Sequence, residues 1–218
     1  MRILGTADFH DNVESFHRTV SKASKNNVDV VAVCGDVTHF GSIERAVSLL
    51  SILRDVSCPV LFVPGNCDPP NLVENNVEGL ELIHGRCLKI GETEFLGVGG
   101  SSPSPFHTPF ELSEMEIANT LERAHKDYHS GKLVLVSHDP PKNTKVDISS
   151  SGEHVGSLSV RRFVEKVKPQ LVLCGHIHEA RGMDRIGSSV IVNPGPARHG
   201  QCVLIDLEGD VKIELSHL

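Results

Sequence analysis

The sequence has few aromatic and few basic side chains. It contains no Trp and a single Tyr, Tyr128, and its 21 Lys and Arg face 28 Asp and Glu, for a formal net charge of −7. Proteins that bind single-stranded nucleic acid stack bases on aromatic side chains, and DNA and RNA binders carry a basic stripe. Stable nucleic-acid binding is therefore not expected. An anionic substrate would need a local positive centre, which a metal cluster can supply.

Long apolar runs and paired cysteines are also missing. No run approaches the roughly 20 apolar residues of a membrane-spanning helix, so no membrane association is expected. The chain starts directly with Met1-Arg2-Ile3-Leu4, without a charged-then-apolar leader, and its six Cys form no Cys-x-x-Cys pair. We expect reduced thiols in a cytoplasmic protein and no closed structural zinc site.

The pattern of apolar residues predicts an α/β fold. Short runs rich in Val, Ile and Leu, bounded by Gly, Pro and Asn, predict strands at 2–5, 28–33, 60–63, 94–98, 132–136, 170–173, 190–192 and 203–207. Helical patterns at 12–25, 43–53, 114–128 and 160–168 lie between several of them, which indicates βαβ units. The stretch 79–100 and the tail from 188 look like strand followed by strand. We therefore expect mixed sheets in a single domain spanning 1–218.

Two long loops interrupt this pattern. Residues 101–112 and 139–156 are rich in Pro, Ser, Gly and polar side chains. Loops of this length in a compact domain are often binding loops or lids, although a flexible surface excursion is the alternative.

Polar residues follow five of the predicted strands directly. Because ligands bind beyond the carboxyl ends of strands in open α/β sheets, these residues are expected to converge. Alternate residues of an extended segment point to the same side. Asp8 with His10, and His176 with His178, are therefore each expected to reach one cation or two adjacent ones. The set comprises Asp8, His10, Asp36, Asn66, His138, His176 and His178.

The composition of this set predicts two metal ions rather than one. Two carboxylates, four imidazoles and an amide oxygen suit divalent Mn, Fe, Zn, Ni or Co. Seven ligands are too many for one catalytic ion with an open position, whereas two ions that share a carboxylate use them all. Any single motif here is weak, since Asp at a strand end is often a helix cap. The prediction depends on the whole ordered series.

This ordered series resembles the calcineurin-like metallophosphoesterase superfamily. Its D-x-H, G-D, G-N-H-D/E, H and G-H-x-H motifs correspond to Asp8-Phe9-His10, Gly35-Asp36, Gly65-Asn66-Cys67-Asp68, His138 and Gly175-His176-Ile177-His178. A finer likeness to small archaeal-type members and metallophosphoesterase-domain relatives rests on runs such as Thr108-Pro109-Phe110-Glu111-Leu112 and His154-Val155-Gly156-Ser157.

The resemblance implies a four-layer α/β/β/α sandwich, the metallo-dependent phosphatase fold, with a dinuclear metal centre. It assigns Asp8, His10, Asp36 and His178 to one metal. It assigns Asn66, His138 and His176, with Asp36 as the bridge, to the other. All seven ligand positions are occupied in this chain. The implied activity is phosphoric ester hydrolysis, in which a metal-bridging hydroxide attacks phosphorus; manganese is one candidate metal.

Cys67 departs from the family pattern, in which most relatives have a His that helps protonate the leaving oxygen. Because a thiol is a poor general acid beside an imidazole, we expect phosphodiesters or activated aryl phosphates to be favoured over alkyl phosphomonoesters. His154 and His107, in the two long loops, are alternative proton donors. His39 is a candidate for supporting a metal ligand, and Arg181 and Arg198 for holding a substrate phosphate.

Three other interpretations compete with this one. A metal-binding protein-interaction scaffold with little catalysis would keep the fold, but the complete ligand set favours an enzyme. A DNA nuclease of the same superfamily would carry a further DNA-binding domain and basic character. A zinc hydrolase acting on acyl esters or amides fits the spacing poorly. The expected partner is a small phosphoester or a nucleotide; the sequence indicates no oligomeric state.

Overall fold

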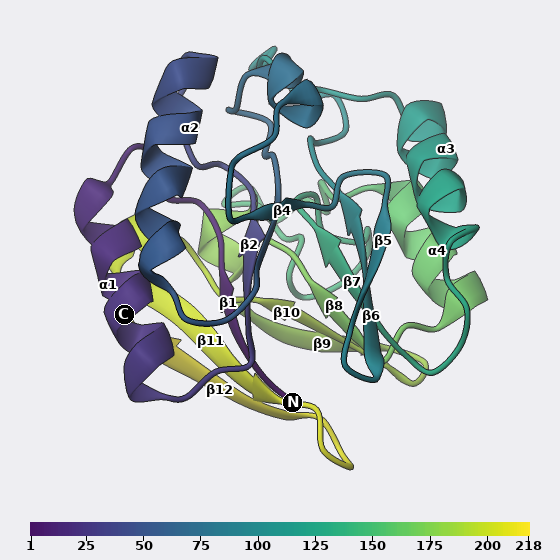
Figure 1. Cartoon of the computed structure of the whole chain (residues 1–218). Coiled ribbons are helices and arrows are strands. Elements are labelled where there is room, and N and C mark those ends of the chain that lie inside the picture. The colour runs from purple at the N-terminus through teal and green to yellow at the C-terminus, as the bar shows by residue number, and fades with distance from the viewer.

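The computed structural model describes residues 1–218 and contains two six-stranded mixed sheets that pack face to face (Figure 1). The first sheet has the order β12-β11-β1-β2-β3-β4 and the second β5-β6-β7-β8-β10-β9. The strands of the first sheet are β1 (Arg2–Thr6), β2 (Val30–Cys34), β3 (Val60–Val63), β4 (Glu81–Leu82), β11 (Gln201–Asp206) and β12 (Lys212–His217). Those of the second are β5 (Cys87–Ile90), β6 (Thr93–Val98), β7 (Lys132–Ser137), β8 (Leu171–Leu173), β9 (Gly182–Ile186) and β10 (Ser189–Asn193).

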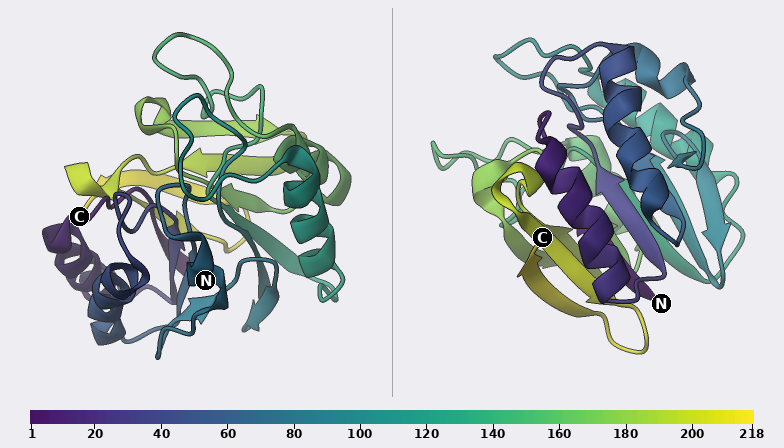
Figure 2. Two further views of the ribbon diagram at one scale, coloured as in Figure 1. Left: turned by 90° about the horizontal axis from the view of Figure 1, so that it is seen from above. Right: turned by 60° about the vertical axis from the view of Figure 1, so that its left-hand side comes forward.

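Helices cover the outer face of each sheet. The four α-helices are α1 (Val13–Lys25), α2 (Ile43–Ser51), α3 (Glu114–His125) and α4 (Leu158–Val167). Helices α1 and α2 lie together on the first sheet, and α3 and α4 on the second (Figures 1 and 2). None of these helices has the length and apolar character needed to cross a bilayer.

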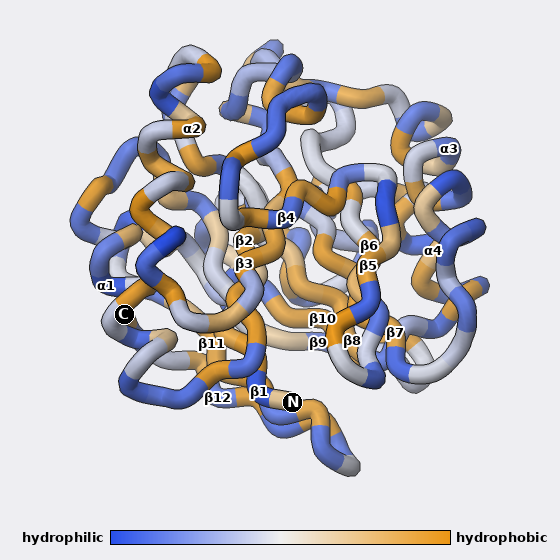
Figure 3. The backbone as a smooth tube through the Cα atoms, viewed as in Figure 1, coloured by the Kyte–Doolittle hydropathy of each residue, from blue (hydrophilic) through white to orange (hydrophobic).

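Three separate apolar clusters fill the spaces between these layers. One cluster joins α1 and α2 to the first sheet and includes Phe16 and Leu50. A second lies between the two sheets and includes Ile3 and Val134. The third joins α3 and α4 to the second sheet. Figure 3 shows the corresponding apolar segments along the strands in the interior. Four layers with three cores confirm the expected α/β/β/α sandwich.

The central strands of both sheets are parallel, which places the loops after them at one edge. Strands β1, β2 and β3 are parallel neighbours in the first sheet, and β6, β7 and β8 are in the second. The buried runs of β2, β3 and β7 consist mostly of Val, Leu and Phe, as expected for strands covered on both faces. Figure 2 (left) looks onto the side of the molecule at which β1 ends.

Most elements begin and end within a few residues of their sequence-predicted positions. Helix α3 begins with a capping box in which Ser113 and Glu116 hydrogen-bond reciprocally. The second predicted helix is shorter than expected: α2 ends at Ser51, and Ile52–Asp55 form a 3-10 turn. Strand β9 was not predicted from the sequence, because its Asp and Arg residues leave too few apolar positions to show the alternation.

A buried carboxylate ties two of the loops at this edge together. Asp68 accepts hydrogen bonds from the backbone N–H of Gly65 (2.8 Å), Val37 (3.1 Å) and Thr38 (2.7 Å), and from the Thr38 hydroxyl (2.9 Å). The loops after β2 and β3 are therefore held in one fixed arrangement. Replacing Asp68 would leave several buried donors without an acceptor.

We predict that Asp68→Ala lowers the free energy of unfolding by about 3 kcal/mol, because each buried donor left unpaired costs about 1–3 kcal/mol and the effects are not additive. Urea denaturation followed by circular dichroism measures the change. Asp210→Ala, at an exposed position between β11 and β12, is the matched control and should change stability little. Equal stability of the two variants would contradict the role given to Asp68.

Candidate metal centre

The residues that follow β1, β2 and β8 enter the site through left-handed backbone turns. Asp8, His10, Asp36 and His176 have φ angles of 58°, 44°, 52° and 69°. Such values are uncommon outside glycine and gather at functional sites. The expectation that Asp8 and His10, or His176 and His178, alternate along an extended segment is therefore wrong. These side chains converge because the backbone turns, not because the strands continue.

Two glycines allow the loops to approach closely enough for this convergence. A Cβ atom at Gly35 would lie 2.5 Å from Nδ1 of His138, and one at Gly65 would lie 2.0 Å from Oδ1 of Asp36. Gly35 also has a φ of +88°, which L-residues with side chains rarely adopt. Glycine at these two positions is thus a steric requirement of the site.

The first group of converging side chains contains Asp8, His10 and His178, whose ligand atoms all lie within 4.8 Å of one another. The Nε2 atoms of His10 and His178 face each other at 3.1 Å. Nε2 of His178 lies 3.6 Å from Oδ1 of Asp8, and Nε2 of His10 lies 3.5 Å from Oδ2 of Asp36. These atoms are close enough together to bind a single ion.

The second group contains Asp8, Asp36 and His138, again within 4.8 Å of one another. Nε2 of His138 lies 3.5 Å from Oδ1 of Asp36 and 2.7 Å from Oδ1 of Asn66. Nδ1 of His138 contacts the Cys34 carbonyl oxygen at 2.6 Å, which orients the ring as the hydrogen-bond partners of metal-binding His do. The His176 ring lies beside that of His138, with centroids 5.1 Å apart. The structure therefore brings all seven predicted ligands together.

Burial keeps two of the imidazoles neutral. Burial lowers the pKa of His10 to about 3 and that of His176 to about 3. A metal ligand must be neutral imidazole, so both rings are already in the protonation state that binds metal.

No Lys or Arg side chain balances the buried carboxylates. Burial opposes the protonation of His138, but the charges of Asp36 and Asp8 outweigh it and raise the pKa of that imidazole, which offsets part of their charge. Burial opposes the ionisation of Asp8, but the hydrogen bond with His178 and the surrounding imidazoles outweigh it and lower the Asp8 pKa. Burial raises the pKa of Asp36, and the nearby Asp8 adds to the effect. No Lys or Arg forms an ion pair with either carboxylate, and buried Nδ1 of His10 has no hydrogen-bond partner. This donor set fits divalent cations, which would supply the missing positive charge.

A broad cavity of about 970 Å³ opens over these side chains. Five of the seven predicted ligands line it, namely His10, Asp36, Asn66, His176 and His178. Both long loops predicted from the sequence contribute to its walls, from Ser102 to Thr108 and from Lys142 to Gly156. The interpretation of these loops as site loops is consistent with their position.

Cys67 lines this cavity, beside the predicted ligands Asp36 and Asn66. Its backbone N–H donates to Oδ1 of Asp36 at 2.8 Å, and Nδ2 of Asn66 lies 3.6 Å from its Sγ atom. Burial, followed by the negative charge of Asp36, raises the pKa of the Cys67 thiol far above its usual range. The side chain is therefore a neutral thiol.

The other candidate side chains separate into those that line the cavity and those that do not. His154 lines it, and its Nδ1 atom lies 2.7 Å from Oδ1 of Asp147. His39 and Arg198 also line it, and one guanidinium nitrogen of Arg198 lies 3.3 Å from Nδ1 of His178. His107 does not line the cavity. Arg181 donates to the carbonyl oxygens of Pro194 and Ser216, which is a structural role.

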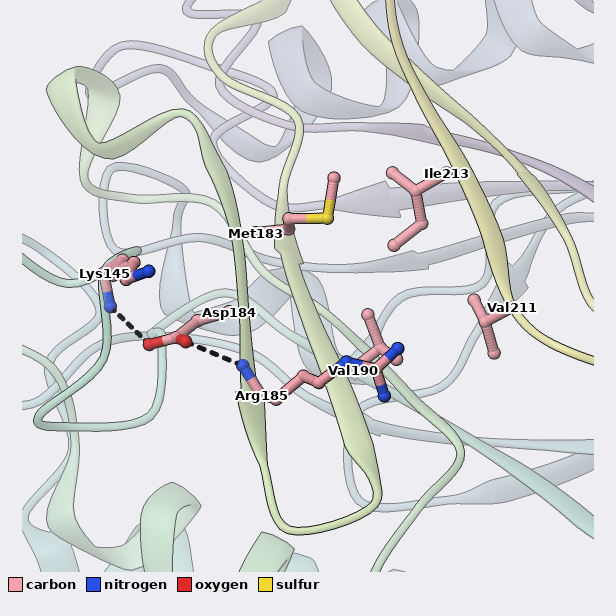
Figure 4. A pocket seen from close by; sticks show the side chains of 7 residues that line it. All are labelled: Lys145, Met183, Asp184, Arg185, Val190, Val211 and Ile213. Carbon is pink, nitrogen blue, oxygen red and sulfur yellow. Dashed lines mark hydrogen bonds between the residues drawn. The ribbon is translucent and has the colours of Figure 1, made fainter.

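A second hollow, of about 430 Å³, lies near the edge strands β9 and β12 (Figure 4). Asp184 accepts there from the backbone N–H groups of Lys145 (2.9 Å) and Arg185 (2.8 Å). Most of its other walls are apolar, including Met183 and Ile213. No group of metal-ligating side chains lies in this hollow, so it is not the candidate site.

Sequence reasoning missed two carboxylates that organise the site. Asp68 lies within the Gly65–Asp68 motif, but the sequence does not indicate that its side chain joins the loops after β2 and β3. Asp147 lies in a polar loop seven residues before His154, and only the folding of that loop brings them together. Phe40 and Phe106, which line the cavity and are 54% and 83% exposed, were also missed. Exposure of an aromatic side chain cannot be read from sequence.

Relatives of known sequence resemble this chain over most of its length. The chain is 39% identical over 200 residues to an uncharacterised protein of Methanocaldococcus jannaschii, covering 90% of this chain and 88% of the relative. It is 29% identical to a probable cyclic nucleotide phosphodiesterase of Vesicomyosocius okutanii, covering 83% and 75% of the two chains.

Solved structures share the fold. A Thermus thermophilus protein superposes with a TM-score of 0.81 at 21% identity, covering 99% of this chain and 98% of the other. A dimetal phosphatase from Danio rerio gives a TM-score of 0.70 at 13% identity, covering 100% and 96%. The family model of the calcineurin-like phosphoesterases matches residues 1–180, a span that contains all seven predicted ligands. The chain therefore belongs to the calcineurin-like phosphoesterase family.

Proposed function

We propose that this chain is a phosphodiesterase that uses two divalent metal ions. The observation that carries the proposal is the convergence of two buried carboxylates and four imidazoles without any lysine or arginine to balance the carboxylates. Buried carboxylates in such surroundings are stable only with a counter-charge. Because the chain belongs to a phosphoesterase family, phosphoester hydrolysis is the reaction that we expect this counter-charge to promote.

We assign the seven ligands as the family motifs suggest. Asp8, His10, Asp36 and His178 would hold one ion, and Asp36, Asn66, His138 and His176 the other. Mixed oxygen and imidazole ligands suit Mn, Fe, Zn, Ni or Co. When bound, such ions make hydroxide available near neutral pH for attack on phosphorus and neutralise charge on the phosphoryl oxygens.

The charges around the cavity support diesters over monoesters. Its lining contains the carboxylates of Glu114, Glu153 and Glu179, whereas its Lys and Arg side chains are Lys142 and Arg198 alone. A phosphomonoester carries about two negative charges near neutral pH, and a diester carries one. The acidic walls therefore repel a monoester more strongly. A relative named as a probable cyclic nucleotide phosphodiesterase is consistent with this preference.

The thiol of Cys67 bears on which leaving groups the site accepts. It occupies the motif position at which most family members carry His, and as a buried thiol it is a weak proton donor to a leaving oxygen. Aryl phosphates with activated leaving groups, which need less protonation, are then favoured over alkyl esters. We propose Cys67 and His154 as the residues that meet the leaving group.

Two aromatic side chains support a nucleotide or other aromatic phosphoester as the substrate. Phe40 and Phe106 are the only large aromatic residues with exposed side chains, and both line this cavity. Phe40 adopts a φ of +60° and its backbone N–H donates to the Cys67 carbonyl oxygen at 3.1 Å, so the structure holds this ring at the cavity in an uncommon conformation.

We predict metal-dependent hydrolysis of bis-p-nitrophenyl phosphate, faster than that of p-nitrophenyl phosphate, when metal-stripped protein receives Mn, Zn, Ni or Mg. Asp36→Asn should lower this activity at least about 1000-fold, because removal of a shared metal ligand removes the charge stabilisation on which the reaction depends. Asp210→Asn is the control and should keep full activity. Metal binding without any turnover would instead support a scaffold.

We predict that Cys67→His raises the turnover of alkyl phosphomonoesters relative to activated aryl diesters such as bis-p-nitrophenyl phosphate. The reason is that an imidazole beside the metal centre can protonate a poor leaving oxygen. Cys67→Ala is the control, because it removes the thiol without adding an imidazole. It should leave the monoester-to-diester ratio of turnover unchanged. The role given to Cys67 is wrong if the monoester-to-diester ratio of kcat/KM is the same in the histidine variant and the wild type.

We predict that Phe40→Ala and Phe106→Ala each raise KM for a nucleoside cyclic phosphodiester about tenfold, with little change in kcat, because stacking on one aromatic ring contributes about 1–3 kcal/mol. The KM of both variants for dimethyl phosphate, or for another small dialkyl diester, should equal that of the wild type. Met115→Ala, an exposed apolar residue outside the cavity, is the control. Equal changes for both substrate types would rule out an aromatic subsite.

A further inference from the structure

One buried carboxylate in the second long loop is not explained by the metal centre. Asp147 is completely buried. Its Oδ1 atom accepts from the Thr144 backbone N–H (2.8 Å) and hydroxyl (3.3 Å), and its Oδ2 atom accepts from the N–H groups of Asn143 (3.0 Å) and Gly156 (3.2 Å). With four such donors, this side chain acts as an acceptor on both oxygens, as an ionised carboxylate does.

The fifth partner of Asp147 is the imidazole of His154. Their contact, 2.7 Å between Nδ1 and Oδ1, fixes the ring with its Nδ1–H directed at the carboxylate. The only ring nitrogen left without a protein partner is Nε2. Since the ring lines the cavity over the metal-ligand set and its side chain is 40% exposed, this nitrogen is available to a molecule in the cavity.

Hydrogen bonds within the loop support this arrangement. Residues 148 and 154 pair across a short antiparallel bridge, and the backbone N–H of Val155 donates to the Asp147 carbonyl oxygen at 3.0 Å. Lys142 donates from Nζ to the His154 carbonyl oxygen at 3.1 Å. The pair therefore lies on a loop that is hydrogen-bonded to itself, which allows accurate positioning of the ring.

Resting on the proposed phosphodiesterase function, we infer that His154 is the general acid that protonates the leaving oxygen, and that Asp147 is its positioning residue. This arrangement supplies from the loop the proton that the thiol at position 67 supplies poorly. A carboxylate that holds an imidazole through Nδ1 and presents Nε2 to the reacting group is a common catalytic arrangement.

In the chemical step, water provides the oxygen of the new bond to phosphorus and gives up one proton to solvent. As the bond between phosphorus and the leaving oxygen breaks, the proton on Nε2 of His154 passes to that oxygen, which departs as an alcohol. The imidazole is left neutral, still bonded to Asp147, and takes up a proton from solvent before the next turnover.

This role predicts which substrates need the pair. Loss of a general acid slows a reaction most when the leaving group is a strong base and least when it is a good leaving group such as 4-nitrophenolate. A residue that only stabilises the loop would slow all substrates by the same factor. Dependence on the leaving group therefore separates the two roles.

The test uses full-length, metal-loaded protein and a series of methyl aryl phosphates, from 4-nitrophenyl to phenyl, with one dialkyl diester. His154→Ala should reduce kcat/KM by about 100-fold for the phenyl and dialkyl diesters but by less than about threefold for the 4-nitrophenyl ester. Asp147→Asn should show the same trend with a smaller loss. His107→Ala, a histidine of the other long loop that does not line the cavity, should change nothing.

A double-mutant cycle guards against simple damage to the loop. In the His154→Ala background, Asp147→Asn should add no further dependence on the leaving group, because the two residues act as a unit. Losses of equal size for every leaving group, or additive effects of the two changes, would overturn the inference while leaving the phosphodiesterase proposal intact. A wild-type protein that hydrolyses no diester with any metal would overturn both.

Discussion

The site depends on one constraint: two carboxylates, Asp8 and Asp36, are buried side by side without a Lys or Arg partner. Left uncompensated, burial of such charges is costly, and two of the imidazoles around them are kept neutral by burial itself. The surrounding polypeptide orients these groups, but it offers only the imidazole of His138, whose pKa these carboxylates raise against the opposing effect of burial, to offset their charge. Divalent cations can balance that charge, and this is why a metal centre, rather than a general acid–base pair of carboxylates, fits the site.

The rest of the structure holds these groups at one place. Parallel strands in two facing sheets carry their loops to a common edge, and left-handed turns at Asp8, Asp36 and His176 direct the side chains toward one another. Gly35 and Gly65 remove the atoms that would keep the loops apart. Asp68 then fixes two of the loops by accepting hydrogen bonds from both. The two long loops add the walls of the cavity above the ligand set.

Sequence reasoning predicted the fold, and which residues converge at the candidate site, because both leave periodic or ordered signals. Buried parallel strands are short apolar runs, and the ligands follow these runs one after another. Sequence reasoning failed for contacts that form only when loops fold back in three dimensions. The pairing of His154 with Asp147, the exposure of Phe40 and the role of Asp68 arise from how loops fold back on themselves, for which spacing along the chain gives no rule. The edge strand β9 was missed because much of it is exposed and its residues are polar.

Whether the buried cluster holds two metal ions is decided by the metal content per chain. Inductively coupled plasma mass spectrometry measures it after loading with Mn or Zn and exhaustive dialysis, with Asp36→Asn measured alongside. We expect two ions per wild-type chain and fewer in the variant, since Asp36 is the ligand proposed to be shared by both positions. Wild-type protein that retains no metal, or the same content in both proteins, would contradict a two-metal site.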